Sequence, residues 1–206
     1  MTRLLKYAIF AVVVSLSTYF CGATELTHIW KEDAYTGAPY SSVLVIGVTD
    51  EEAVRRSFEN RFVRKLKGKG IEAFSSAAVI SSEKRLKKEV IIAAIQELGA
   101  DAVLVTHLVG VEEEDVRSPS TGFAVGDSYQ GEYYQDYHAA YDHVHGPRYY
   151  TTHVKVRLET NLYDARTEKK IWTAQSQTVN PQSDAELFNA VIDAVIRNLR
   201  KNKLLS

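Results

Sequence analysis

Nearly unbroken apolar runs mark three strands in the first half of the chain. Residues 42–48 (SVLVIGV) and 101–111 (DAVLVTHLVGV) are apolar and rich in β-branched side chains, as in strands buried on both faces of a sheet. A shorter run at 71–76 (IEAFSS) predicts a strand between them. Helical spacing separates the runs, with one apolar stripe in 50–67 and another in 82–98, each ended by glycine. The order strand–helix–strand–helix–strand predicts a parallel sheet.

The second half of the chain has a different pattern. Residues 152–164 alternate apolar and polar positions, which predicts a half-exposed antiparallel strand, and 170–179 follows as its hairpin partner. A last helical stripe runs from about 183 to 201. We therefore predict an α/β fold with an α+β tail, in the order β-α-β-α-β, long insert, β-hairpin and carboxyl-terminal helix. It should form a single mixed sheet covered by three helices.

The first 23 residues have the composition of an export signal. Arg3 and Lys6 precede the apolar run Tyr7–Leu16. A membrane-spanning helix needs about 20 apolar residues, so this run is too short to cross a bilayer and has the length of a signal-peptide core. We predict a signal peptide over 1–23 and a protein of the periplasm.

Two endings of this leader are open. Cys21, the single cysteine, directly follows the apolar segment, as does the lipidated cysteine of a bacterial lipoprotein. Phe20 and Thr18 stand where a lipobox has a small residue and usually a leucine. The other ending is ordinary cleavage after Ala23. Lipidation of Cys21 would anchor the protein to the outer membrane without a spanning segment.

Two segments lack clear periodicity. Residues 24–40 are polar, with Gly37 and Pro39 as breakers, and we expect an irregular tether there. It would lead into one α/β domain over 41–206. Within this domain, the tyrosine- and histidine-rich insert 112–150 is expected to be either a functional loop or a disordered segment.

Three pieces of the chain carry a family resemblance. They are the opening VLVIGVTD (43–50), the strand entry ELGADAVLVTHLVG (97–110) and the Tyr-Asp-x-x-Thr…Trp turn (163–172). In these pieces the chain resembles small bacterial envelope lipoproteins: it is similar to the amino-terminal domain of TolB, the Tol-system β-propeller protein, and to the core of curli-secretion-type lipoproteins. The resemblance implies a periplasmic binding or assembly role. The segment 112–148 departs from it, since it lacks the alternating apolar strands of a membrane-pore hairpin.

Tyrosine is concentrated in the insert, where seven of the chain's twelve tyrosines lie between Tyr129 and Tyr150. Tyrosine offers a large contact area at low entropy cost and is enriched at interfaces. The alternative is that these rings pack over the edge of their own sheet. We predict a surface for an envelope protein or a cell-wall component, formed by Tyr129, Tyr133, Tyr134, Tyr137 and Tyr141.

Histidines form the one cluster that suggests site chemistry. The cluster comprises His138, His143, His145 and His153, with Asp136 and Asp142 among them. Imidazole is the commonest ligand for zinc and copper, and two histidines separated by one residue lie on the same side of an extended strand. The alternative is a set of solvated side chains on a polar loop. A periplasmic metal-binding protein is therefore the second functional hypothesis.

No catalytic motif accompanies these features. The sequence contains no G-x-S-x-G, H-E-x-x-H or C-x-x-C, and the first strand–helix turn has carboxylates where a phosphate would bind. The balance of 25 basic and 26 acidic residues gives a net charge of −1, which argues against nucleic acid as a partner. We expect a non-catalytic envelope protein without a cofactor. A hydrolase that lacks the familiar motifs is the remaining class.

Overall fold

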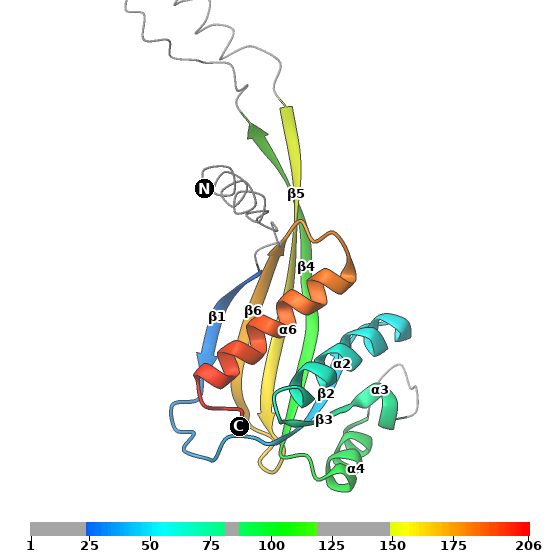
Figure 1. Cartoon of the computed structure of the whole chain (residues 1–206), viewed down its shortest axis with the longest axis vertical. Helices are drawn as coiled ribbons and strands as arrows, with labels where there is room; N and C mark the ends of the chain where they lie inside the picture. Colours follow the sequence, from blue (N-terminus) through cyan, green and yellow to red (C-terminus); the bar gives the residue numbers. More distant parts are fainter. Residues whose placement is uncertain (1–23, 81–86, 119–148) are drawn as a thin grey trace, which may run out of the picture.

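A mixed six-stranded sheet forms the centre of the computed structural model, which describes residues 24–80, 87–118 and 149–206 (Figure 1). The strand order is β1-β6-β5-β4-β2-β3. The strands are β1 (Thr24–Lys31), β2 (Ser42–Val48), β3 (Glu72–Ser75), β4 (Ala102–Ser118), β5 (Tyr149–Asp164) and β6 (Lys170–Val179). The helices are α2 (Glu52–Lys67), α3 (Ser76–Val79), α4 (Lys88–Leu98) and α6 (Asp184–Lys201). The predicted α/β fold is confirmed, with α3 as a single additional turn.

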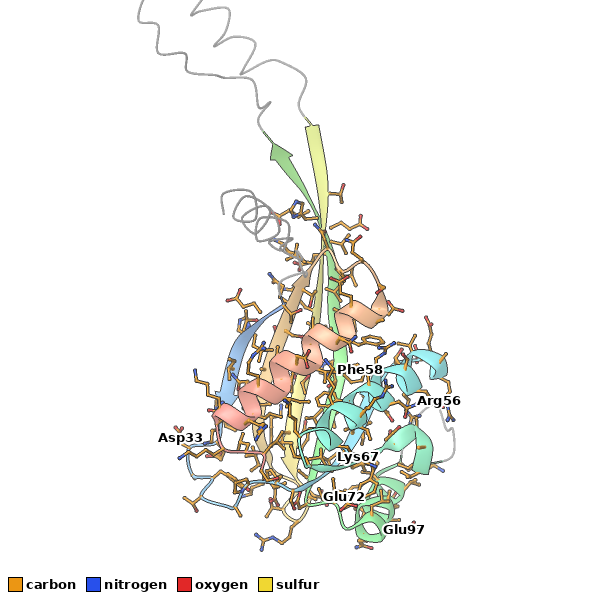
Figure 2. The ribbon with its side chains drawn as sticks, in the orientation of Figure 1. Asp33, Arg56, Phe58, Lys67, Glu72 and Glu97 are labelled. Atoms are coloured by element: carbon orange, nitrogen blue, oxygen red, sulfur yellow. The ribbon has the colours of Figure 1, made fainter. Side chains whose placement is uncertain are left out.

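Helices cover both faces of the sheet, and one face carries a larger hydrophobic cluster than the other. Helices α2 and α6 lie on one face, where Phe58 meets Phe188 edge-on at 5.3 Å between ring centroids. Figure 2 shows Phe58 between its helix and the sheet, whereas Arg56 points away from the core. Helix α4 covers the opposite face, against a smaller cluster that includes Leu44 and Val103. Because alternate residues of β2 enter the two clusters, the predicted burial of this strand on both faces is confirmed.

Pairing follows the predicted order of parallel and antiparallel strands. Strand β2 is parallel to both β3 and β4, and the two crossovers run through α2 and α4. Strands β4, β5 and β6 are antiparallel neighbours. Trp172 on β6 is fully buried and donates from Nε1 to Asn198 Oδ1 of α6 at 3.1 Å. This hydrogen bond satisfies the polar end of the largest side chain in the core.

The amino-terminal segment corrects one expectation. Residues 24–31, predicted to belong to an irregular tether, form strand β1 at the edge of the sheet, where Thr24 pairs with Thr178. The pairing shifts register between Thr27 and Trp30, and His28 has a φ of 49° at this bulge. The bulge breaks the period-2 alternation by which the strand could have been predicted.

Strands β4 and β5 extend beyond the rest of the sheet. They pair from Ala102 and Asp164 to Ser118 and Tyr149. Strand β2 accompanies β4 only as far as His107, and β6 accompanies β5 only from Lys155. Residues 113–118 and 149–154 therefore project as a two-stranded extension, here called the ribbon (Figure 1). The expected insert 112–150 is thus partly strand, and its central part, 119–148, lies outside the described residues.

The helix ends differ in part from the predicted ones. Helix α2 begins at Glu52 without a side-chain cap, and Thr49 Oγ1 instead accepts from the N–H of Glu51 at 3.3 Å. Helix α4 is described from Lys88, later than predicted. Ser183 caps α6 through the N–H of Glu186 at 3.2 Å. Within the described part of the chain, no helix is long and apolar enough to cross a membrane.

Candidate binding groove

A groove opens where β2 ends beside β4, on the face covered by α2 and α6. Its volume is about 340 Å³, and its walls come from the starts of both helices and from β4 and β5. Strand β4 continues past this point, so the groove lies beyond the carboxyl end of β2 alone. Ligands of open α/β sheets bind beyond the carboxyl ends of the strands.

The lining of the groove is mainly apolar and unusually open to solvent. Val48, Leu108 and Val111 are 56%, 54% and 55% exposed, more than any other large apolar side chain among the described residues. Leu187 and Phe188 form the deeper wall. Exposed apolar side chains that gather at one place are typical of a binding surface.

These exposed side chains correct the expectation that 101–111 is buried throughout. Strand β2 ends at Val48, opposite His107, so the positions beyond His107 have no covering neighbour on that side. The lengths of the two apolar runs already indicated this exposure. The run 42–48 has seven residues and the run 101–111 has eleven, so a strand formed by the first cannot cover the second over its full length.

Carboxylates surround the groove. Glu51 lies at the start of α2 and Asp184 at the start of α6, and both line the groove. Glu113 follows on β4, opposite Val154, which packs against the core on this face. Arg55 also lines the groove, but it is only 6% exposed and its guanidinium is paired with Glu52 and Glu59. The rim is therefore negatively charged and favours a positively charged ligand.

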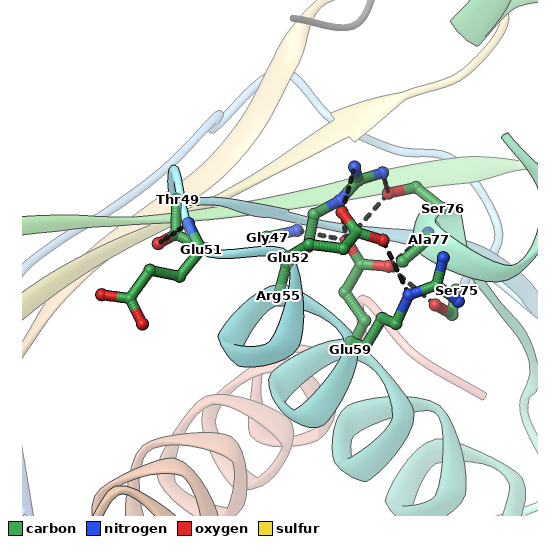
Figure 3. A network of polar contacts seen from close by, with 10 residues as sticks. Gly47, Thr49, Glu51, Glu52, Arg55, Glu59, Ser75, Ser76 and Ala77 are labelled. Atoms are coloured by element: carbon green, nitrogen blue, oxygen red, sulfur yellow. Dashed lines mark hydrogen bonds and ion pairs between the residues drawn. The ribbon is translucent and has the colours of Figure 1, made fainter. Parts of the chain in front are cut away.

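A buried polar network holds the start of α2 at the groove (Figure 3). Glu59 is fully buried, and both of its carboxylate oxygens accept hydrogen bonds from β2, α2, β3 and α3. The donors are Gly47 N at 2.8 Å, Arg55 Nε at 3.2 Å, Ser75 Oγ at 2.7 Å, Ser76 Oγ at 2.8 Å and Ala77 N at 2.7 Å. A carboxylate offers about four lone-pair positions, so Glu59 has no capacity left for a substrate. We assign it a positioning role.

A larger hollow at the opposite end of the sheet is a weaker candidate. It measures about 840 Å³ and contains Tyr40 and Asp164. Tyr40 donates to Asp164 Oδ2 at 3.2 Å, and burial raises the pKa of its hydroxyl. Burial also raises the pKa of the Asp164 carboxyl, but hydrogen bonds from the Thr167 hydroxyl and N–H, both 2.7 Å, outweigh it, so this pKa is lowered. These groups are occupied in closing the β5–β6 turn.

Most of the predicted site residues lie outside the described residues, so the hypotheses built on them stay predictions. They are Cys21, Tyr129, Tyr133, Tyr134, Tyr137, Tyr141, His138, His143 and His145. His153 is described, and it lies half-buried on β5 opposite Glu114 of β4. Within 24–80, 87–118 and 149–206, no group of three or more histidine, cysteine or carboxylate side chains could hold a metal ion.

Comparison with known proteins gives distant structural similarity. No protein-family model and no curated protein sequence matches the chain. One similar solved structure is a PelC dodecamer from Paraburkholderia phytofirmans, at 12% identity and a TM-score of 0.45, covering 84% of this chain and 95% of that one. Another is lipoprotein GNA1162 from Neisseria meningitidis, at 17% identity and a TM-score of 0.40, covering 78% and 99%. A putative neuraminyllactose-binding hemagglutinin homolog from Helicobacter pylori has 12% identity and a TM-score of 0.34, covering 84% and 90%. The resemblance to the Tol-system and curli-secretion-type proteins stays a prediction.

Proposed function

We propose that this chain is a non-catalytic binding or assembly protein of the cell envelope, exported to the periplasm by residues 1–23. Its ribbon presents the tyrosine-rich segment 119–148 to a partner, either another envelope protein or a cell-wall component. The leader supports the export step, and lipidation at Cys21 would add a membrane anchor.

The geometry of the ribbon supports the binding role. Ser118 and Tyr149 are directly paired, so segment 119–148 starts and ends at one point. Six residue pairs separate this point from the level at which β6 ends, a length of about 20 Å for an extended strand. Contact with a partner at the far end of the ribbon would therefore leave the core undisturbed.

Two ion pairs brace the base of the ribbon. Lys155 pairs with Glu114 and Arg157 pairs with Glu112, in each case between β5 and β4. The Lys155 ammonium lowers the pKa of the Glu114 carboxyl, which keeps this pair ionised. Exposed ion pairs contribute little to overall stability, so we assign these contacts a role in fixing the pairing register of β4 and β5.

The test replaces segment 119–148 by Asn-Gly, a turn that can join two directly paired residues in a hairpin. We expect the melting temperature to change by less than about 4 °C, because a loss of about 1 kcal/mol already produces a shift of that order. Capture of a partner by crosslinking in envelope fractions should be lost. A second variant keeps the length and changes only Tyr129, Tyr133, Tyr134, Tyr137 and Tyr141 to serine, and it should also lose capture.

If both variants still captured the partner, segment 119–148 would not be the binding surface. Intact mass measured on the protein from native membranes tests the export step in the same preparation. An acylated chain beginning at Cys21, or a chain beginning at Thr24, agrees with the proposal. A full-length polypeptide that retains Met1 in the cytosol contradicts it.

A further inference from the structure

The edge of β4 that faces away from β5 has no neighbouring strand in its outer half. Strand β2 pairs with β4 only up to His107, and no other described strand follows on that side. In an antiparallel pair, alternate residues direct both N–H and C=O away from the partner strand. From Val109 to Ser118, none of these outward groups has a backbone partner among the described residues. Such an edge is a template for an additional strand.

The side chains along this edge differ between its two faces. Leu108 and Val111 line the groove, and Glu113 follows on the same face. Glu112 and Glu114 lie on the other face, opposite Lys155 and His153 of β5. Their side chains are 53% and 56% exposed although both are ion-paired, so they can still meet a further positive charge.

We propose that the free edge of β4 accepts an extended segment of a partner protein as an added strand, in which apolar and basic side chains alternate. Side chains of a strand point alternately to the two faces, so the apolar ones would enter the groove beside Val48, Leu108 and Val111. The basic ones would meet Glu112 and Glu114. Main-chain hydrogen bonds would supply affinity, and the alternation would supply specificity.

A second copy of this chain fits this edge poorly. It could offer the end strands of its sheet, β1 and β3, or its own outer half of β4. Pairing two outer halves of β4 would bring the carboxylates of Glu112 and Glu114 of both copies together. In β1, Glu25 and Thr27 lie on the face opposite Leu26. Pairing β1 of a second copy with the free edge of β4 would therefore place the Glu25 carboxylate near the carboxylates of β4. Strand β3 has four residues, too few to cover the edge from Val109 to Ser118. Charge and length therefore favour a segment of another protein.

This inference rests on β4 and the groove and does not use segment 119–148. The probe is a fluorescein-labelled peptide of about eight residues with blocked ends, in which valine and lysine alternate. We expect the full chain to bind it at least about tenfold more tightly than a peptide of the same composition with its valines and lysines in two blocks. Anisotropy titration measures both affinities. Equal affinities would overturn the proposal, because they would show charge attraction without strand pairing.

Val111→Glu should weaken peptide binding about tenfold, since it introduces a carboxylate into the apolar part of the groove. The matched control is Val79→Glu, which changes another half-exposed valine, on α3, away from the free edge. Both variants should melt as the parent does. An equal effect of the two substitutions on binding would contradict the proposed location.

Backbone pairing can be tested with the unaltered protein. Methylating the amides of alternate peptide residues blocks one edge of the peptide, and methylating the other set blocks the opposite edge. We expect one pattern to abolish binding and the other to preserve it. Preserved binding with both patterns would overturn strand addition. A protein that self-associates, binds no peptide and becomes monomeric with Val111→Glu would show that a second copy covers the edge, which also overturns the proposal.

Discussion

At the scale of single residues, Glu59 and Arg55 form a buried ion pair. Removing two charges from water is costly, and the cost is offset only when the hydrogen-bonding capacity of the buried groups is satisfied. Glu59 meets this condition through five donors on four elements. Only the fold brings these donors together, because Gly47, Ser75 and Ser76 are twelve to seventeen positions away in the chain. The position of Glu59, next to Phe58 of the apolar stripe, was the available sequence signal.

Glu59→Gln should lower the free energy of unfolding by about 3 kcal/mol, because the amide leaves the buried Arg55 without its anionic partner. Urea denaturation measures this difference. Glu52→Gln is the control, since Glu52 contacts the same arginine but is 41% exposed, and it should cost less than about 1 kcal/mol. Equal losses for the two variants would show that burial of Glu59 does not determine its effect.

Asp164 makes stability depend on pH. Its pKa is lowered in the fold, so its ionised form stabilises the native state above its ordinary pKa of 3.8, and this contribution is lost as the pH falls through the lower folded value. Asp164→Asn should cost about 1.5 kcal/mol at neutral pH. This difference in the free energy of unfolding between the variant and the parent protein, here called the gap, should close below pH 3.8.

Thermal unfolding of both proteins at a series of pH values measures this gap. Asp33→Asn serves as the control because Asp33 is exposed, and it should change the free energy of unfolding by less than about 0.5 kcal/mol at neutral pH. If the gap for Asp164→Asn stayed constant into the acid range, the charge would not be its cause.

At the scale of the elements, the end of α4 was well specified by the sequence and its start was not. Gly99 follows the last apolar position and adopts φ 63°, the left-handed conformation that ends many helices. No comparable residue marks the start, where Lys87 supplies no side-chain cap. The same contrast applies to β4. Its apolar run predicted the inner half, and its outer half is held by cross-strand pairing with β5, which no local pattern of residues 112–118 indicates.

Gly99→Ala should destabilise the protein by about 1 kcal/mol, because a Cβ is unfavourable at this positive φ even though no neighbouring atom crowds it. Gly110→Ala is the matched control. Gly110 also has open space around its Cβ position but no positive φ, so alanine there should be neutral or slightly stabilising. Calorimetry of the two variants should give shifts that differ in size or sign, and equal losses would contradict the backbone argument.

At the scale of the whole molecule, the sequence indicated the α/β class and the order of most elements, because burial on one or two faces imposes a visible period. The groove could not be predicted in the same way. It is lined by five elements that are far apart in the chain, β2, α2, β4, β5 and α6, and its apolar residues have the same pattern as core residues. Strand β1 was missed because its place depends on pairing with β6, some 150 positions later.

That last pairing has a consequence for the order in which the protein can fold. The earliest described strand needs β6 as its neighbour, and Tyr40 pairs its backbone with Leu204 and Ser206 at the very end of the chain. Closing a loop over such a span is entropically costly, and these contacts can form only after residues 170–206 have been synthesised. Strand β1 and Tyr40 can therefore complete the sheet only after β2, β4 and β5 are already available for pairing.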